Sequence, residues 1–185
     1  MSDSSSTTDI YMYFLPPGNI KGEALATGEA VDKDQSLKGK FAFEVTSVTF
    51  DAKNEENIGQ KAGGGGGGGG GADAGKIKFE AIKISKMTDQ ATPGLVEACS
   101  SGRKIREGVI QFRRNHKVFM EYFLADCVIS QIQTKGGGGG EPTDDITIDY
   151  EAIRVEYSRQ KENGEMQKVG EAKWNRTKSE ASYPY

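Results

Sequence analysis

The chain has 185 residues, of which 28% are charged, and its formal net charge is −3. Such a slight acidic excess creates no global field that attracts nucleic acid or an anionic membrane, so binding to polyanions is disfavoured. No run of about 18 apolar residues is present, which excludes a membrane-spanning helix. The sequence also lacks a basic and apolar leader at its start, so no classical export signal is expected.

Glycine accounts for 25 residues, and fourteen of these lie in two uninterrupted runs, 63–71 and 136–140. Neither run has the Gly-X-Y period of collagen, and the rest of the sequence uses glycine at an ordinary frequency. A nine-residue glycine chain spans about 16 Å as a random coil. We therefore interpret both runs as surface loops of a single domain.

The N-terminal part combines a polar tail, one strand and a long loop. Residues 1–9 are polar and predict a disordered tail. Residues 10–15 are apolar and aromatic and are followed by two prolines, which predicts a strand that starts at Ile10. The polar segment from Asn19 to Gly39 has little periodicity and predicts a long loop, and loops of that length in compact domains are usually functional or ordered by a partner.

Two segments, 40–50 and 76–85, alternate apolar and polar residues and then change phase. The two apolar sets of the first segment are Phe41, Phe43 and Val45, then Val48 and Phe50. Strands that change phase midway contribute to two inner surfaces, which is typical of a curved sheet or barrel. Residues 146–157 show the same change.

One short helix is predicted between Thr92 and Gly102. Thr92 is the expected N-cap, Pro93 suits the first turn, and Gly102 is the expected C-terminal stop. Leu95, Val96 and Cys99 are expected to share its apolar stripe.

Further strands are predicted at 108–112, 117–133, 146–157 and 169–175. Seven or eight strands with one helix and no alternation of strands and helices indicate a mainly β fold. We expect a two-sheet antiparallel β-barrel, or a sandwich, with one short flanking helix and an extended loop.

The sequence offers little that supports catalysis, and we expect no catalytic residue, metal site or cofactor. Gly70, Gly75 and Lys76 match the start of a phosphate-binding loop, but Ile77 stands where a Ser or Thr is required. The single histidine, His116, falls in an apparent hairpin turn, which excludes a metal site with several histidines.

Cys99 and Cys127 leave two further interpretations open. Both are expected as reduced, packed thiols, although a nucleophile formed by either cysteine with His116 remains an alternative. Two basic clusters, 103–106 and 113–117, are expected to be solvated loop ends rather than a nucleic-acid site.

Five stretches of the sequence resemble the Hcp family, whose members build the inner tube of the bacterial type VI secretion system. They are FLPPGNIKGEA, GKIKFEAIKISK, ATPGLVEACSSG, GGGGGEPTDDITIDYEAIRVEY and GEAKWN, in that order along the chain. The resemblance covers roughly residues 10–178. It implies a tube domain over 10–178 with Gly-rich loops at 63–71 and 136–140, after the tail 1–9 and before a C-terminal tail, 179–185.

The resemblance also implies a structural role without enzymatic activity. Family members form homohexameric rings that stack into a tube inside a contractile sheath and leave the cell with a VgrG spike protein, without a signal peptide. Assembly would take place in the bacterial cytoplasm, and the lumen would carry or chaperone effector cargo. No nucleic acid or membrane insertion is implied. The resemblance thus implies a secreted tube protein that acts in virulence or in competition between bacteria.

The charged residues of the long loop are the candidates for assembly contacts between rings, namely Lys33, Asp34, Lys38 and Lys40. Ring-to-ring contacts are expected to be polar, because the stack has to come apart after ejection. The alternatives are a tube protein of a phage-tail-like contractile injection machine, a monomeric β-barrel that binds a small ligand, and a thiol hydrolase.

Overall fold

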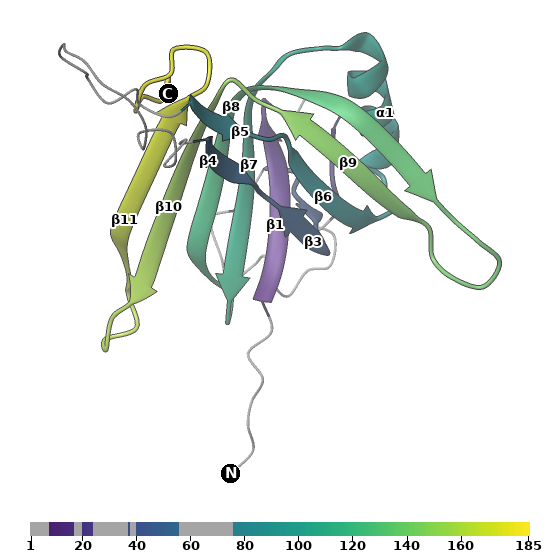
Figure 1. Ribbon diagram of the computed structural model, residues 1–185. Coiled ribbons are helices and arrows are strands. Elements are labelled where there is room, and N and C mark those ends of the chain that lie inside the picture. The colour runs from purple at the N-terminus through teal and green to yellow at the C-terminus, as the bar shows by residue number, and fades with distance from the viewer. Residues whose placement is uncertain (1–7, 17–19, 24–36, 38–39, 56–75) are drawn as a thin grey trace, which may run out of the picture.

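The computed structural model describes residues 8–16, 20–23, 37, 40–55 and 76–185 (Figure 1). Its elements in chain order are β1 (Thr8–Leu15), β2 (Phe43–Glu44), β3 (Ser47–Thr49), β4 (Ala52–Glu55), β5 (Lys76–Phe79), β6 (Ile82–Met87), α1 (Thr92–Ser101), β7 (Ile105–Arg114), β8 (Lys117–Lys135), β9 (Thr143–Asp149), β10 (Ala152–Gln160) and β11 (Met166–Asn175). The mainly β fold with one short helix is confirmed, but β1 starts at Thr8 and not at Ile10, because Thr8 and Asp9 pair with Arg114 and Arg113 of β7. Of the glycine runs, 63–71 lies outside the described residues, whereas 136–140 is an exposed turn between β8 and β9.

Nine of the described strands form two antiparallel sheets that share the long strand β8, and β4 pairs only with β5. Sheet A has the order β2-β1-β7-β8-β10-β11, and sheet B has the order β3-β6-β9-β8. The first half of β8 pairs with β7 and β10, and its second half pairs with β9. Between the halves, Asp126 adopts a φ of 48°, which bends the strand from one sheet into the other.

At the opposite corner the chain itself joins the two sheets. The N–H of Val45 donates to the carbonyl of Ile10 in β1, over 2.8 Å, whereas the N–H of Thr46 donates to the carbonyl of Ser85 in β6, also over 2.8 Å. Consecutive residues therefore bond to different sheets. With the bend in β8, this crossing completes a small barrel, and β10 and β11 extend sheet A beyond it.

The expected phase changes are confirmed, with one correction. Segment 40–50 crosses between the sheets, and Phe43 and Val45 are buried while Val48 is only partly covered. Phe41 does not share their face, because it adopts a φ of 51° and remains 37% exposed. Ala42 takes the buried place instead. The left-handed conformation at Phe41 thus shifts the alternation by one residue.

The helix forms over the predicted residues, but its details differ. Gly102 adopts a φ of 60° and ends the helix as predicted. The N-cap is Ala91 and not Thr92, because the Thr92 hydroxyl is engaged by the sheet. Val96 is 44% exposed, and Leu95 and Ala98 form the buried stripe. Gly94 is buried beside them, and the helix packs against β8.

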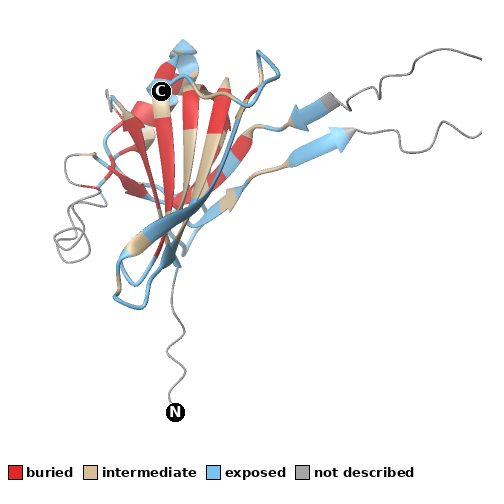
Figure 2. Cartoon of the chain, turned by 90° about the vertical axis from the view of Figure 1, so that its left-hand side faces the viewer, coloured by how far each residue is buried: buried red, intermediate tan, exposed pale blue. Residues whose placement is uncertain are grey.

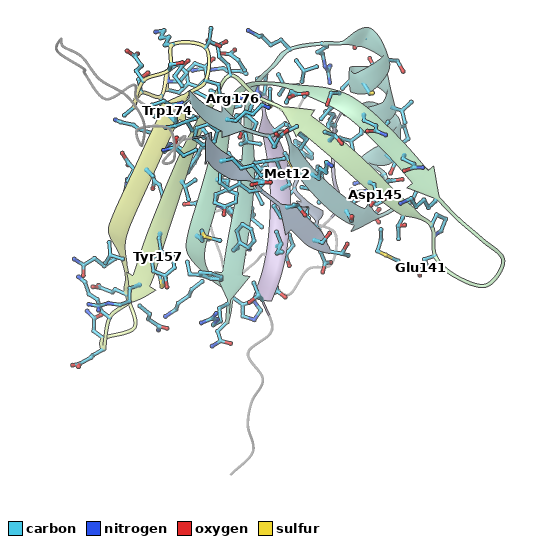
Figure 3. All side chains as sticks on the ribbon, in the orientation of Figure 1. Met12, Glu141, Asp145, Tyr157, Trp174 and Arg176 are labelled. Carbon is cyan, nitrogen blue, oxygen red and sulfur yellow. The ribbon has the colours of Figure 1, made fainter. Side chains whose placement is uncertain are left out.

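The core lies between the two sheets (Figure 2). Met12, labelled in Figure 3, and Phe14 come from sheet A, and Ile84, Ile146 and Ile148 come from sheet B. These side chains are at most 2% exposed. The barrel is therefore filled by its own side chains, which argues against a ligand inside it. No helix in the described part of the chain has the length and apolar character to cross a membrane.

Candidate functional site

The structure does not bring Cys127 and His116 together. Cys127 is fully buried beside Gly108, and burial raises the pKa of its thiol to about 12. His116 lies in the turn between β7 and β8, where it and Asn115 both have positive φ, as the predicted hairpin requires. Cys127 is the cross-strand partner of Ile105, which lies at the opposite end of β7 from the turn. The length of β7 therefore separates Cys127 from His116.

The other chemical candidates are also dispersed. Gly70 and Gly75 lie outside the described residues, and Lys76 begins strand β5 rather than a helix. Among the residues that the structure describes, no group of three or more His, Cys, Asp or Glu side chains is placed to hold a metal ion. Neither observation supports a phosphate or metal site.

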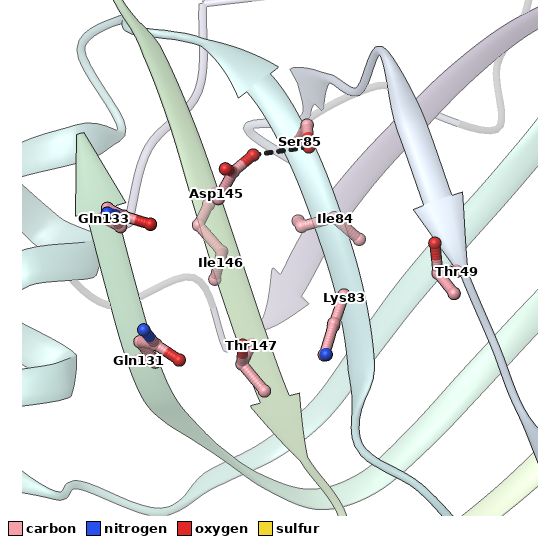
Figure 4. Close-up of a pocket in the computed structure, with 9 residues that line it drawn as sticks. All are labelled: Thr49, Lys83, Ile84, Ser85, Gln131, Gln133, Asp145, Ile146 and Thr147. Carbon is pink, nitrogen blue, oxygen red and sulfur yellow. Dashed lines mark hydrogen bonds between the residues drawn. The ribbon is translucent and has the colours of Figure 1, made fainter. Parts of the chain in front are cut away.

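The most distinctive surface is the outward face of sheet B, which is covered by polar side chains (Figure 4). Cross-strand pairing aligns them in two rows, Ser47–Ser85–Asp145–Gln133 and Thr49–Lys83–Thr147–Gln131. They face outward because they alternate with the buried isoleucines of β6 and β9. The face is hollowed into a shallow depression of about 320 Å³. We call this surface the polar face of sheet B.

The polar face carries two charged side chains, Lys83 and Asp145, and Asp145 is paired with Lys135 beside the face. Asp145 accepts a hydrogen bond from the Lys135 ammonium and one of 2.6 Å from the Ser85 hydroxyl. These two bonds lower the pKa of the Asp145 carboxyl. The other members, apart from Lys83, are hydroxyls and amides, so the surface mainly offers neutral hydrogen bonds.

Behind this face, a buried ion pair attaches the helix to the sheet. Lys86 and Asp144 are both fully buried, and the Lys86 Nζ lies 3.3 Å from Asp144 Oδ2. Asp144 also accepts hydrogen bonds from Thr92 at the start of α1 and from Thr134 in β8. Lys86 has a second carboxylate partner, Asp89, at 2.6 Å. The network links four elements, β6, β8, β9 and α1, beneath the polar face.

A second distinctive feature is the ribbon formed by β4 and β5, which projects from the barrel and is largely exposed (Figure 2). Its base packs onto sheet A through Phe79, whose ring lies 6.2 Å from that of Trp174. Further along the ribbon, Ile77 remains 40% exposed. Isolated two-stranded ribbons are only marginally stable in water.

Of the four candidate contact residues, the structure describes one. Lys33, Asp34 and Lys38 lie outside the described residues. Lys40 donates a hydrogen bond of 3.0 Å to the Tyr13 hydroxyl, and its ammonium lies 4.7 Å from the centre of the Tyr13 ring. Its contact is thus within its own subunit, and an assembly role for the four residues stays a prediction.

Sequence reasoning missed the polar face and the packing of the C-terminal residues. The signal for the face was present, because Lys83, Ser85, Asp145 and Thr147 occupy the alternate positions of strands that were correctly predicted. What the sequence does not reveal is that these strands are neighbours. For Tyr183 and Tyr185, no periodicity distinguishes them from a solvated tail.

Comparison with known proteins points to one family. The family model described as "Type VI secretion system effector, Hcp" matches residues 18–157. Protein hcp1 of Pseudomonas aeruginosa is 30% identical over 95 residues, which cover 48% of this chain and 58% of that protein. The aligned region thus spans less than two thirds of that relative.

Solved structures agree on the fold. A structure of a type six secretion system protein superposes with a TM-score of 0.74 at 21% identity and covers 94% of this chain and 99% of that one. Hcp1 from Salmonella typhimurium superposes with a TM-score of 0.65 at 18% identity and covers 93% and 97% of the two chains. A type VI secretion effector from Yersinia pestis gives 0.63 at 14% identity, covering 90% and 99%.

Proposed function

Because the chain belongs to the Hcp family of type VI secretion proteins, we propose that it is a structural component of the secretion tube. In this proposal, six copies close into a ring, and rings stack into the inner tube that is propelled from the cell with its spike. Head-to-tail contacts that close laterally give rings, and contacts that repeat along the axis give filaments. The role requires no catalytic residue.

We propose that the polar face of sheet B lines the lumen of the ring. The observation that supports this is its composition, since short hydroxyl and amide side chains cover a hollowed four-stranded surface. A wall of this kind offers transient hydrogen bonds to a passing protein without an apolar patch that would retain it. Effector cargo would therefore be held weakly and released after ejection.

We also propose that contacts between rings use the projecting ribbon β4–β5 and the loop charges Lys33, Asp34, Lys38 and Lys40. The ribbon supports this because Ile77 is 40% exposed and the described residues around it are exposed as well. A neighbouring copy that covers this side chain would stabilise the ribbon.

The wider role follows from the same proposal. The protein would assemble in the bacterial cytoplasm within a contractile sheath and be secreted with a VgrG spike to the extracellular space or the target cell. A tube protein of another contractile injection machine would share this architecture, and the neighbouring genes distinguish the two.

Ring formation can be tested directly. Light scattering after size-exclusion chromatography is expected to give the mass of a hexamer, and negative-stain microscopy is expected to show annular particles. A monomer at high protein concentration, without rings, contradicts the tube proposal.

The lumen assignment has a separate test. Thr147→Arg places six guanidinium groups in the lumen of each ring, so the variant is expected to keep the hexameric mass and to export less cargo. Gln167→Arg, on the exposed edge strand β11, adds the same side chain away from the polar face; it is the matched control and is expected to change neither quantity. Loss of the hexamer in Thr147→Arg alone would show that this face is a subunit contact instead.

A further inference from the structure

The last residues of the chain lie against the outer side of sheet A. After β11, the N–H of Asn175 donates to the carbonyl of Glu180 over 2.8 Å, so the chain reverses its direction. Ser179, within this reversal, adopts a φ of 53°. Residues 181–185 then carry two tyrosines, Tyr183 and Tyr185, which contact three strands.

Tyr183 fits between charged and aromatic partners from different strands. Its hydroxyl donates a hydrogen bond of 2.7 Å to the Glu107 carboxylate of β7. Its ring lies 4.8 Å from the Arg154 guanidinium of β10, and the same guanidinium lies 4.2 Å from the ring of Phe123 in β8. Arg154 therefore contacts two aromatic rings, which is a geometry suited to a planar cation.

Tyr185, two residues further along the chain, makes the same kinds of contact. Its hydroxyl donates to the Asp126 carboxylate over 3.3 Å, and the Arg106 guanidinium lies 4.6 Å from the centre of its ring. The two tyrosine rings are 6.1 Å apart and nearly perpendicular. Each phenol thus has one carboxylate acceptor and one arginine, and the pair is spaced by a single proline.

We propose that this surface is a binding site for a peptide segment of the type Tyr-x-Tyr, which the chain fills with its own tail and which the tail of a second copy can fill in its place. The tyrosine-binding surface consists of Arg106, Glu107, Phe123, Asp126 and Arg154. The second copy is the favoured occupant because it carries the same two phenols at the same spacing. The site itself does not depend on the proposed tube, because its contacts are seen within one chain.

The covalent link explains why the site is filled from within one chain. A short flexible tether holds its end at an effective concentration in the millimolar range. Tyr185 remains 44% exposed, so the outer half of the segment is only partly enclosed and can exchange. Where copies are concentrated in an assembly, the tail of a neighbour competes at a similar local concentration, and tails can then connect subunits.

The site is tested with a fluorescein-labelled peptide of residues 178–185 and full-length protein, by fluorescence anisotropy. The variant Tyr183→Ala/Tyr185→Ala, whose surface is vacant, is expected to bind the peptide at least tenfold more tightly than the wild type. Adding Arg154→Ala to this variant is expected to weaken binding at least tenfold. Equal binding by wild type and vacant variant, or no binding by the vacant variant, overturns the site.

A second variant keeps the test valid if the double alanine change unfolds the protein. Tyr183→Phe/Tyr185→Phe keeps both rings and removes both hydroxyls, so its tail is expected to be displaced by the peptide more readily than the wild-type tail. Far-UV circular dichroism checks that each variant is folded. If the phenylalanine variant binds the peptide no more tightly than the wild type does, the two carboxylates do not hold the tail.

The source of the peptide is tested by mixing two chains. One carries 3-fluorotyrosine in an intact tail and the changes Glu107→Gln/Arg154→Ala in its own surface, and the other is the unlabelled vacant variant. The fluorine signal of Tyr183 is expected to shift on mixing, and not to shift when the second chain also carries Arg154→Ala. Peptide binding without this shift overturns the second copy as the occupant.

Discussion

The buried pair Lys86–Asp144 makes the strongest prediction for stability. Asp144→Asn keeps the shape of the side chain but removes its charge. The carboxylate accepts hydrogen bonds on both oxygens, from Thr88 and Thr134 on Oδ1 and from Thr92 and Lys86 on Oδ2. An asparagine can keep the two bonds to its amide oxygen, whereas its NH2 group then faces the Lys86 ammonium. The variant therefore leaves a buried charge with one fewer acceptor.

The expected loss is about 3 kcal/mol in the free energy of unfolding. Removing one partner of a buried ion pair typically costs roughly 3–5 kcal/mol, because the remaining charge stays desolvated. The lower end of this range applies here, since Lys86 keeps Asp89 at 2.6 Å and the carbonyl of Met87 at 2.7 Å.

Chemical denaturation of the full chain measures this loss, with all proteins at one concentration because assembly contributes to stability. Asp145→Asn is the matched control. It changes the neighbouring carboxylate, whose side chain is 38% exposed, and exposed ion pairs contribute only about 0–1 kcal/mol. Equal losses for the two variants, both below about 1 kcal/mol, would refute the reasoning.

The same pair predicts a pH dependence. Burial alone would raise the pKa of the Asp144 carboxyl, but the hydrogen bonds from Thr92 and Thr134 and the charge of Lys86 outweigh it and lower the pKa from its ordinary value. A carboxyl with a lowered pKa in the folded state stabilises the fold above its unfolded pKa. The advantage of wild type over Asp144→Asn is thus expected to be full at neutral pH and to decline as the pH falls through the folded pKa.

Three further predictions concern single positions. A methyl group at Gly108 would lie 3.2–3.3 Å from three buried side-chain atoms, so Gly108→Ala is expected to cost about 1–3 kcal/mol by denaturation, whereas Gly170→Ala, with open space around it, is not. Asp126→Val forces a β-branched residue into a φ of 48° and is expected to cost about 1–3 kcal/mol more than Asp126→Asn. Iodoacetamide at pH 8 is expected to modify Cys99 and to spare Cys127 until the protein unfolds, by mass spectrometry.

Periodicity predicted the fold well because most strands have one buried and one solvated face. The change of phase within residues 146–157 marks the passage from β9 in sheet B to β10 in sheet A. The bend inside β8 left no such signal, since residues 117–123 are all partly covered on both faces. The bend depends on the backbone of one residue, Asp126, whose type does not demand a positive φ.

The surfaces were harder to predict than the strands, because a surface depends on which strands are neighbours. Thr49 and Gln131 are far apart in sequence and reach one face only through the order β3-β6-β9-β8. The ion pair of Lys86 and Asp144 was hard to predict for the same reason. In the sequence both residues resemble ordinary solvated charges, and only the pairing of β6 with β9 brings them together. Long-range pairing is the information that local patterns lack.

The bend at Asp126 connects the two surfaces on which our proposals rest. It fixes the direction of the second half of β8, and thereby of the polar face of sheet B, relative to sheet A. The side chain of the same residue accepts the hydrogen bond from Tyr185. The residue at the bend is thus also the hydrogen-bond acceptor for the tail. If subunits exchange tails, the incoming tail binds at the bend between sheet A and the polar face of sheet B. Asp126→Asn removes the charge of the acceptor but keeps a residue that tolerates a positive φ, so it is expected to affect tail binding more than folding.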